Sequence, residues 1–273
     1  VFDFLMKTQS LRFGEAVKTL AAEAGMQQFK FTKLDEKREK RYQLYKGIYL
    51  DYQNLNKKNL FFQENADVLN YLVKRGLSKK TIEEFNVGFS KNNSLESLRK
   101  KFSEEELIQS GIFYKNEATK NLIDRFKSRI LFPINNLSGD TIAFGGRAIS
   151  KNAIAKYINS PETEFYKKGK ILFNLDKAKN LRSKTDQVII VEGYMDVLSL
   201  YNKGVYNVIS NSGTAITENQ IDLIWNFFLN PIISLDGDKS GQNASIRIAE
   251  RLFPKITESK NIHFLSLPDG KDP

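Results

Sequence analysis

The sequence predicts an α/β protein in which a mixed α+β N-terminal lobe precedes a parallel sheet with helices on its faces. The last third of the chain alternates short apolar runs with helical segments, the order that builds a parallel sheet. Two of these runs, residues 188–191 and 232–235, are almost entirely apolar, which is typical of strands buried on both faces. The part before them mixes amphipathic helices with one pair of extended segments, which predicts a separate lobe.

Two amphipathic helices are predicted near the N-terminus. Residues 10–24 have helical spacing, and Gly25 follows where a helix commonly ends. Residues 26–34 have no period and predict a linker, and residues 35–56 predict a longer helix. The apolar stripe of that helix consists of Leu44, Tyr45, Ile48, Tyr49, Tyr52 and Leu55. We expect this stripe to pack into the core rather than to stack bases.

Short helices and then a hairpin are predicted in the middle of the chain. Residues 66–75 end before Gly76, residues 78–85 begin at a Ser78 cap, and Ser103 with Glu106 predicts a capping box. Residues 129–134 and 141–147 predict two strands joined by a Ser-Gly-Asp turn.

Two glycines precede an arginine at the end of the second hairpin strand. Gly145 and Gly146 allow a backbone or a ligand to come close, and Arg147 projects from the same place.

A basic stretch follows the hairpin. Residues 151–184 contain nine Lys or Arg against three acids. Aromatic side chains are interleaved at Tyr157, Phe165, Tyr166 and Phe173. This composition is typical of a groove that binds a single-stranded nucleic acid. The formal net charge of +10 also favours a polyanionic partner such as nucleic acid, with a solvated lysine-rich surface as the alternative.

Composition excludes several kinds of protein. The chain has no cysteine, so it has no disulfide framework, thiolate metal site or cysteine nucleophile. No apolar run approaches the roughly 18 residues that a membrane span needs, and we expect no membrane partner. The chain begins with Val1 and stops after Asp-Gly-Lys-Asp-Pro, so we expect it to be a fragment of a longer protein.

The last third predicts strands over residues 188–191, 207–210, 232–235 and 262–267. The helices between them are predicted over residues 194–203, from Thr217 onward, and over residues 242–253. In open α/β sheets, ligands bind outside the carboxyl ends of the strands. His263, the only histidine, lies in the last strand, and we expect it to be a strand residue rather than a catalytic base or ligand.

Carboxylates follow two of these strands directly. Glu192 follows the first, and Asp236 and Asp238 follow the third. Because converging carboxylates repel each other, a hard cation such as Mg²⁺ is the natural group to hold them together. Asp-Gly by itself is ordinary turn chemistry, but acids after successive buried strands predict a metal site. Asp196 lies in the first turn of the following helix, where it either complements the helix dipole or supports the metal ligands.

These motifs resemble two known modules. EGYMD, DGDKSG and LPDGKDP look like the Toprim domain of bacterial primases, type IA and II topoisomerases and related nucleases. RFKSRILFPI, IAFGGR and KYINSPETEFYKKGKILFNL resemble the RNA polymerase core of DnaG-type bacterial primases, as does YLVKRGLSKKTIEEFNVGF. The family's zinc-binding ligands and its helicase-binding domain have no counterpart in these residues.

The resemblance implies synthesis of RNA primers on single-stranded DNA from ribonucleoside triphosphates, in the primosome of the bacterial cytoplasm. It implies Mg²⁺ or Mn²⁺ at Glu192, Asp236 and Asp238, with Asp196 and Asp272 as further acids of the site. The basic residues that match nucleotide or template contacts are Arg75, Arg147, Lys156 and Lys168. Zinc and the replicative helicase are expected to bind other parts of the family's chains, and we expect a monomer.

We therefore expect three parts. Residues 1–34 resemble the tail of the zinc-binding module with a linker, residues 35–184 form a basic lobe, and residues 185–273 form a Toprim domain truncated at its C-terminal end. Two other functions stay open. One is a Toprim nuclease or topoisomerase-like enzyme, and the other is a catalytically silent module that binds single-stranded nucleic acid.

Overall fold

The computed structural model describes residues 1–9, 11, 13–25, 33–91, 93–150, 152–211, 215–271 and 273. The chain divides into two compact units, Val1–Leu44 and Tyr45–Pro273. The predicted domain boundaries after residues 34 and 184 stay a prediction. Within the described part, no helix combines the length and the apolar character needed to cross a membrane.

The first unit consists of helices. It contains α1 (Phe2–Thr8), α2 (Phe13–Glu23) and the first part of α3 (Lys33–Phe61), with Leu5 and Ala16 buried. The predicted helix over residues 10–24 is present as α2, and Gly25 follows it with φ of +65°. The predicted linker over residues 26–34 lies outside the described residues except for its last two, which begin α3. Helix α1 was not predicted.

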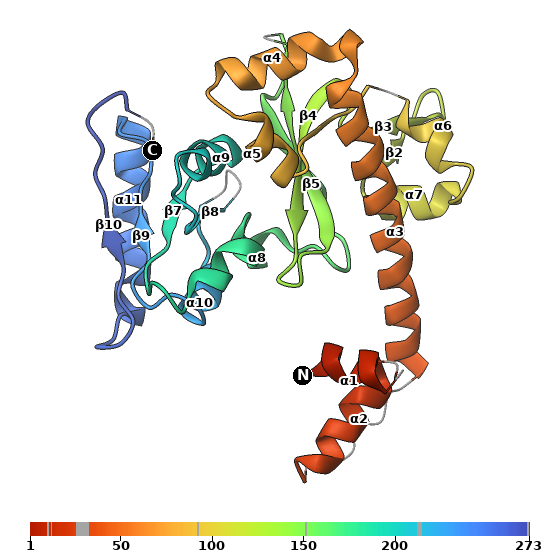
Figure 1. Cartoon of the computed structure of the whole chain (residues 1–273). Helices are drawn as coiled ribbons and strands as arrows, with labels where there is room; N and C mark the ends of the chain where they lie inside the picture. The colour runs from red at the N-terminus through yellow and green to blue at the C-terminus, as the bar shows by residue number, and fades with distance from the viewer. Residues whose placement is uncertain are drawn as a thin grey trace. The chain divides into compact units, whose positions relative to one another are not determined.

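In the second unit, the rest of α3 packs against the hairpin of β4 (Arg129–Asn135) and β5 (Thr141–Ala148) (Figure 1). The ring of Phe144 in β5 lies 6.0 Å from that of Tyr49 and 5.1 Å from that of Tyr52. Both tyrosines are buried. The aromatic stripe of α3 is therefore core, as the sequence predicts.

The hairpin forms the centre of a four-stranded antiparallel sheet of order β1-β4-β5-β6, with β1 at Gly88–Phe89 and β6 at Tyr157–Asn159. Gly139 takes φ of +84° in the predicted turn. A second hairpin, β2 (Phe113–Lys115) with β3 (Leu122–Asp124), was not predicted.

Short helices surround these strands. They are α4 (Ala66–Lys74), α5 (Lys79–Glu84), α6 (Ser94–Leu98), α7 (Glu104–Gln109) and α8 (Leu175–Ala178), with 3-10 turns at Gln63–Asn65, Lys168–Lys170, Lys179–Leu181 and Phe253–Lys255. The predicted caps are present. The Ser78 hydroxyl accepts from the Thr81 amide at 3.2 Å, and Ser103 with Glu106 forms a capping box. These bonds satisfy amides that the first helical turn leaves unpaired.

The second sheet is parallel, in the order β10-β9-β7-β8. Its strands are β7 (Ile189–Val191), β8 (Val208–Ser210), β9 (Ile232–Ile233) and β10 (His263–Phe264), and its helices are α9 (Tyr194–Asn202), α10 (Glu218–Trp225) and α11 (Lys239–Leu252). The element order is as predicted, but β9 and β10 are shorter than predicted. His263 is an exposed strand residue.

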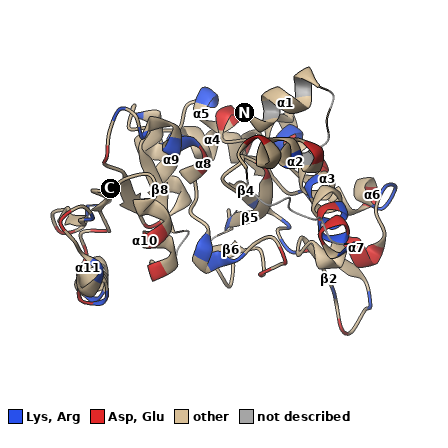
Figure 2. Cartoon of the chain, turned by 90° about the horizontal axis from the view of Figure 1, so that it is seen from below, with Lys and Arg blue, Asp and Glu red and all other residues tan. Residues whose placement is uncertain are grey.

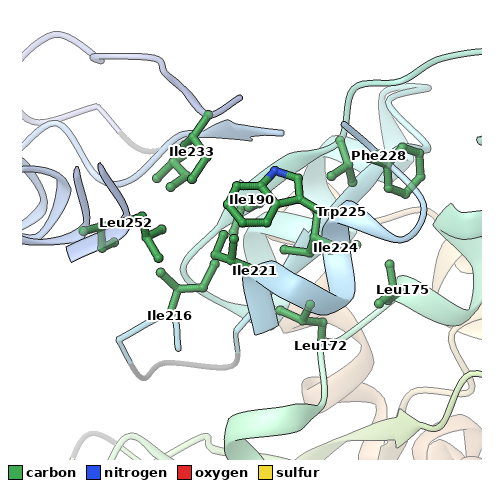
Figure 3. Packing of buried hydrophobic residues seen from close by; sticks show 14 of the residues in the cluster. Leu172, Leu175, Ile190, Ile216, Ile221, Ile224, Trp225, Phe228, Ile233 and Leu252 are labelled. Carbon is green, nitrogen blue, oxygen red and sulfur yellow. The ribbon is translucent and has the colours of Figure 1, made fainter. Parts of the chain in front are cut away.

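One core packs this sheet against α10 and α11 (Figure 3). Ile190 and Ile233 of the sheet pack with Ile221, Trp225 and Leu252 of α10 and α11. Burying such side chains contributes roughly 1.5–3 kcal/mol each. The core fixes the sheet, and with it the position of the residues that follow each strand.

Only part of the basic stretch, residues 151–184, is exposed at the surface. Basic positions occur around β6, and charges of both signs occur along α3 (Figure 2). Tyr166 and Phe173 are buried and Phe165 is half-buried, whereas Tyr157 is 39% exposed. Of the four aromatic residues expected in a binding groove, Tyr157 is therefore the one available to stack on a base.

Candidate active site and nucleic-acid interface

Two of the predicted acids meet at the carboxyl edge of the parallel sheet. Glu192 follows β7, and Asp236 follows the segment that continues β9. The Asp236 amide donates to Oε1 of Glu192 at 3.3 Å, and both residues are half-buried. Neighbouring parallel strands thus bring together residues that are 44 positions apart in the sequence.

Asp238 and Asp196 each accept a hydrogen bond from a main-chain amide at the N-terminus of a helix. The Asp238 carboxylate accepts from the Gly241 amide at 2.8 Å, so α11 begins at Lys239 rather than at the predicted residue 242. The Asp196 carboxylate accepts from the Gly193 amide at 2.8 Å. Asp196 therefore stabilises the turn that presents Glu192, whichever further role it has.

The metal ligand set stays a prediction. Among the described residues, no three His, Cys, Asp or Glu side chains lie together as a group that could hold a metal ion. Asp272 lies outside the described residues. A cavity of about 390 Å³ borders Glu192, and Arg247 and Arg251 also line it. These arginines add positive charge beside Glu192.

Arg147 lies on β5 in an unusual environment. It is 6% exposed, and its Nε and Nη1 have no hydrogen-bond partner within the described part of the chain. Its guanidinium carbon lies 4.8 Å from the ring centroid of Tyr71 and 5.6 Å from that of Tyr157. The arginine is thus held mainly by aromatic rings.

The other predicted basic residues are more accessible. Arg75 is exposed, and its Nε donates to the Tyr71 hydroxyl at 3.2 Å. Lys156 is exposed, with Nζ 5.9 Å from the Tyr157 ring centroid. Lys168 is half-buried, and its amide donates to the Glu162 carboxylate at 3.1 Å. Arg75, Arg147 and Lys156 therefore gather around two tyrosines.

The pKa of Tyr157 depends both on basic residues of this group and on Asp196. Burial raises the pKa of the Tyr157 hydroxyl, the charges of Arg147 and Arg75 lower it, and the charge of Asp196 raises it. The charges of Arg147, Arg75 and Asp196 therefore all act on this one phenol. Basic and acidic residues of the predicted site thus share one region.

Tyr194 joins the two sheets at this place. Its hydroxyl donates to Oδ1 of Asn159 in β6 at 2.6 Å, and its ring stacks on Phe132 at 5.2 Å. A Cβ atom on Gly145 would lie 2.4 Å from the Tyr194 ring. Gly146 likewise faces the ring of Phe126. The groups that come close to the two glycines are therefore aromatic side chains.

Gly145→Ala is expected to lower the free energy of unfolding by about 1–3 kcal/mol, because the buried Tyr194 ring would have to move. Urea unfolding measures this effect. Gly47→Ala in α3 is the control, since its Cβ would meet only Phe102 at 3.8 Å. That change should raise stability by up to about 1 kcal/mol. Equal effects of the two substitutions would contradict the packing described for Tyr194.

A second junction lies at the other end of α9. The Asn202 amide donates to the Gly76 carbonyl at 2.9 Å, and its oxygen accepts from the Ser78 amide at 3.0 Å and the Thr81 hydroxyl at 2.8 Å. Sequence reasoning missed Asn202, for which no local signal exists. It also missed Tyr71, although the spacing of four residues to Arg75 places both on one helix face.

Comparisons with known proteins agree with this architecture. Residues 55–179 match the family model described as DNA primase catalytic core, N-terminal domain, and residues 189–273 match the model described as Toprim-like. The fold and the site define a catalytic core of the Toprim-containing class. The chain belongs to the family of bacterial DnaG-type primases.

Individual relatives are similar over most of this chain. The DNA primase of Haemophilus influenzae is 36% identical over 281 residues, which are 99% of this chain and 46% of that protein. A solved DnaG primase catalytic domain bound to ssDNA has a TM-score of 0.78 at 32% identity, covering 86% of this chain and 74% of that one. The Escherichia coli primase catalytic core has a TM-score of 0.76 at 34% identity, covering 85% and 74%. The chain thus spans about half the length of the curated relative.

Proposed function

We propose that this chain carries the catalytic core for synthesis of RNA primers on single-stranded DNA. The observation that supports it is the junction at Tyr194. This residue ties the sheet that ends in Glu192 and Asp236 to Asn159 of β6, next to the strand that carries Arg147. A template or nucleotide phosphate at the basic residues would then lie close to the acids. A similar catalytic domain has been solved with ssDNA bound, which agrees with this proposal.

Glu192, Asp236 and Asp238 are proposed to hold Mg²⁺ or Mn²⁺. Their carboxylate oxygens fit a hard divalent cation, and the Asp236 amide already holds the Glu192 carboxylate at the sheet edge. When bound, such an ion lowers the pKa of an attacking hydroxyl and stabilises charge on a phosphoryl group. Asp196 positions the turn before α9, and Asp272 is proposed as a further acid of the site.

The basic residues are proposed to bind phosphate oxygens of the template and of ribonucleoside triphosphates. Arg147 and Arg75 offer guanidinium groups, which bind phosphate with two parallel hydrogen bonds, and Lys156 and Lys168 act as point charges. The exposed ring of Tyr157 could stack on a base. We further propose the replicative helicase as a partner and the bacterial cytoplasm as the compartment.

Radiolabelled ribonucleotide with a primed single-stranded template tests this function. Label that enters a product in the presence of Mg²⁺ or Mn²⁺, and not with chelator, is the expected result. Cutting of the template without incorporation would instead favour a Toprim nuclease. Retention of DNA with neither activity would favour a silent binding module.

Lys156→Ala and Lys168→Ala should each weaken binding of single-stranded DNA and reduce the slope of log K against log salt by about one. Each change removes one charge. The hydrogen bonds of Lys168 with Glu162 and Gln220 involve its main-chain amide and carbonyl, which alanine keeps. Fluorescence anisotropy over a salt series measures the slope. Lys115→Ala, at an exposed position of β2, is the control. An unchanged slope would remove the lysine from the site.

A further inference from the structure

We propose that Tyr71 is a positioning residue for phosphate binding. Its ring holds the guanidinium of Arg147, and its hydroxyl holds the guanidinium of Arg75. The inference rests on the proposed function, because it takes phosphate of the template or of a nucleotide as the ligand of both arginines.

The geometry comes from two elements that are distant in the sequence. Tyr71 and Arg75 lie four residues apart at the end of α4, where the Arg75 Nε donates to the Tyr71 hydroxyl at 3.2 Å. Arg147 and Tyr157 are paired residues of the neighbouring strands β5 and β6. The Arg147 guanidinium lies within cation–π distance of both rings, 4.8 Å from Tyr71 and 5.6 Å from Tyr157. Tyr71 therefore contacts both arginines.

The burial of Arg147 explains why aromatic rings lie beside its guanidinium. Arg147 as a whole is 6% exposed, so its guanidinium loses most of its hydration, and its Nε and Nη1 have no hydrogen-bond partner among the described residues. Aromatic faces attract the cation without occupying its N–H groups. The two donors are thus left unpaired within the described part of the chain, and an anion pairs with guanidinium more strongly than neutral groups do. Because the two nitrogens are enclosed, a phosphate has to displace a neighbouring side chain to pair with them.

The α4–α5 turn fixes where Tyr71 lies. Asn202 of α9 bonds to Gly76, Ser78 and Thr81 just after Arg75. Helix α9 begins at Tyr194, next to Glu192. Helix α9 therefore begins two residues after Glu192 and bonds to the α4–α5 turn at its other end, so it links the turn beside Arg75 to the segment that holds Glu192.

Two substitutions separate the two roles of Tyr71. Tyr71→Phe keeps the ring near Arg147 and removes the hydroxyl that holds Arg75, whereas Tyr71→Leu removes both. We expect Tyr71→Leu to raise the Kd for a fluorescein-labelled single-stranded oligonucleotide, or the KM for ribonucleotide, by about tenfold with little change in kcat. Tyr71→Phe should have a smaller effect of about two- to threefold. The parameter that changes, Kd or KM, tells template phosphate from nucleotide phosphate.

A double-mutant cycle gives the decisive comparison. Tyr71→Phe should have no further effect in an Arg75→Ala background, and Tyr71→Leu should lose most of its effect in an Arg147→Ala background. Tyr114→Leu is the matched control. Its ring lies 5.3 Å from the Arg125 guanidinium carbon on the β2–β3 hairpin, outside the proposed site.

Equal Kd and KM values for the parent chain and Tyr71→Leu would overturn the inference, as would full additivity in both cycles. Oligonucleotide binding is measured without catalysis. Absence of incorporation by the parent chain would therefore count against the proposed polymerase activity, while the Kd values for the oligonucleotide still decide whether Tyr71 positions a template phosphate.

Discussion

Asp236→Ala is expected to reduce ribonucleotide incorporation by about a thousandfold, since removing a metal-holding carboxylate forfeits several kcal/mol of charge stabilisation. Asp236 lies at the sheet edge, and its amide bonds to the Glu192 carboxylate at 3.3 Å. The change shortens the side chain and leaves that amide in place, so the fold and the affinity for single-stranded DNA should persist. Incorporation of labelled ribonucleotide and urea unfolding, measured on the same preparation, check both parts.

Two comparisons sharpen this test. Asp222→Ala removes an exposed acid of α10 that pairs with Lys255 at 2.8 Å, and it should leave incorporation unchanged. Asp238 also caps α11, so Asp238→Ala mixes loss of charge with loss of a cap worth about 1 kcal/mol. Asp238→Asn keeps a good capping residue and removes the charge. If Asp236→Ala and Asp238→Asn both incorporate label at the rate of the parent chain, the acids are not the metal ligands.

Asp124→Ala is expected to lower the free energy of unfolding by about 3 kcal/mol or more, because it leaves several buried donors unpaired. Asp124 is 4% exposed at the end of β3. Its carboxylate accepts from the Tyr52 hydroxyl at 2.9 Å, the Ser90 hydroxyl at 2.7 Å and the Phe126 amide at 2.8 Å. It thus connects α3, the segment after β1, and the β3–β4 connection. Urea unfolding measures the loss, and a change below 1 kcal/mol would contradict this role.

The control for Asp124 lies on α3. Asp51 pairs with Lys101 at 2.8 Å on the surface, and Asp51→Ala should cost less than about 1 kcal/mol. Both changes remove one carboxylate, so their difference reports burial and hydrogen bonding rather than net charge.

The same carboxyl group should give stability a pH dependence. Burial raises the pKa of Asp124 above its ordinary value of 3.8, although the bonds from Ser90, Phe126 and Tyr52 oppose the shift. The folded state therefore binds the proton more tightly than the unfolded state does. This contribution to stability is present below the unfolded pKa and is lost as pH rises through the folded pKa. Asp124→Asn has no carboxyl group at this position, so its free energy of unfolding should lack this part of the decline with pH. Urea unfolding at a series of pH values from about pH 4 upward measures the difference.

Most elements followed from local patterns, and the differences have identifiable causes. The caps at Ser78 and Ser103 and the glycines after helices depend on a few adjacent residues, so they were predicted correctly. The β2–β3 hairpin and β6 were missed because three-residue strands are too short to show a period and form by pairing with distant chain. Helix α11 was predicted to begin too late because Asp238 was considered only as a metal ligand.

The sequence was sufficient to predict that Glu192 and Asp236 lie at one edge of the sheet. Continuous apolar runs show that their strands are buried on both faces, and acids that directly follow parallel strands lie at the same edge. The sequence was also sufficient for the family, through motifs that the comparisons confirm. Packing decided which residues contact Arg147 and which side chain fills the space beside Gly145. Tyr71 contacts Arg147, which lies 76 positions later, and Tyr194 packs against Gly145, which lies 49 positions earlier. Local sequence patterns do not predict these contacts, because they depend on how whole helices and strands pack together.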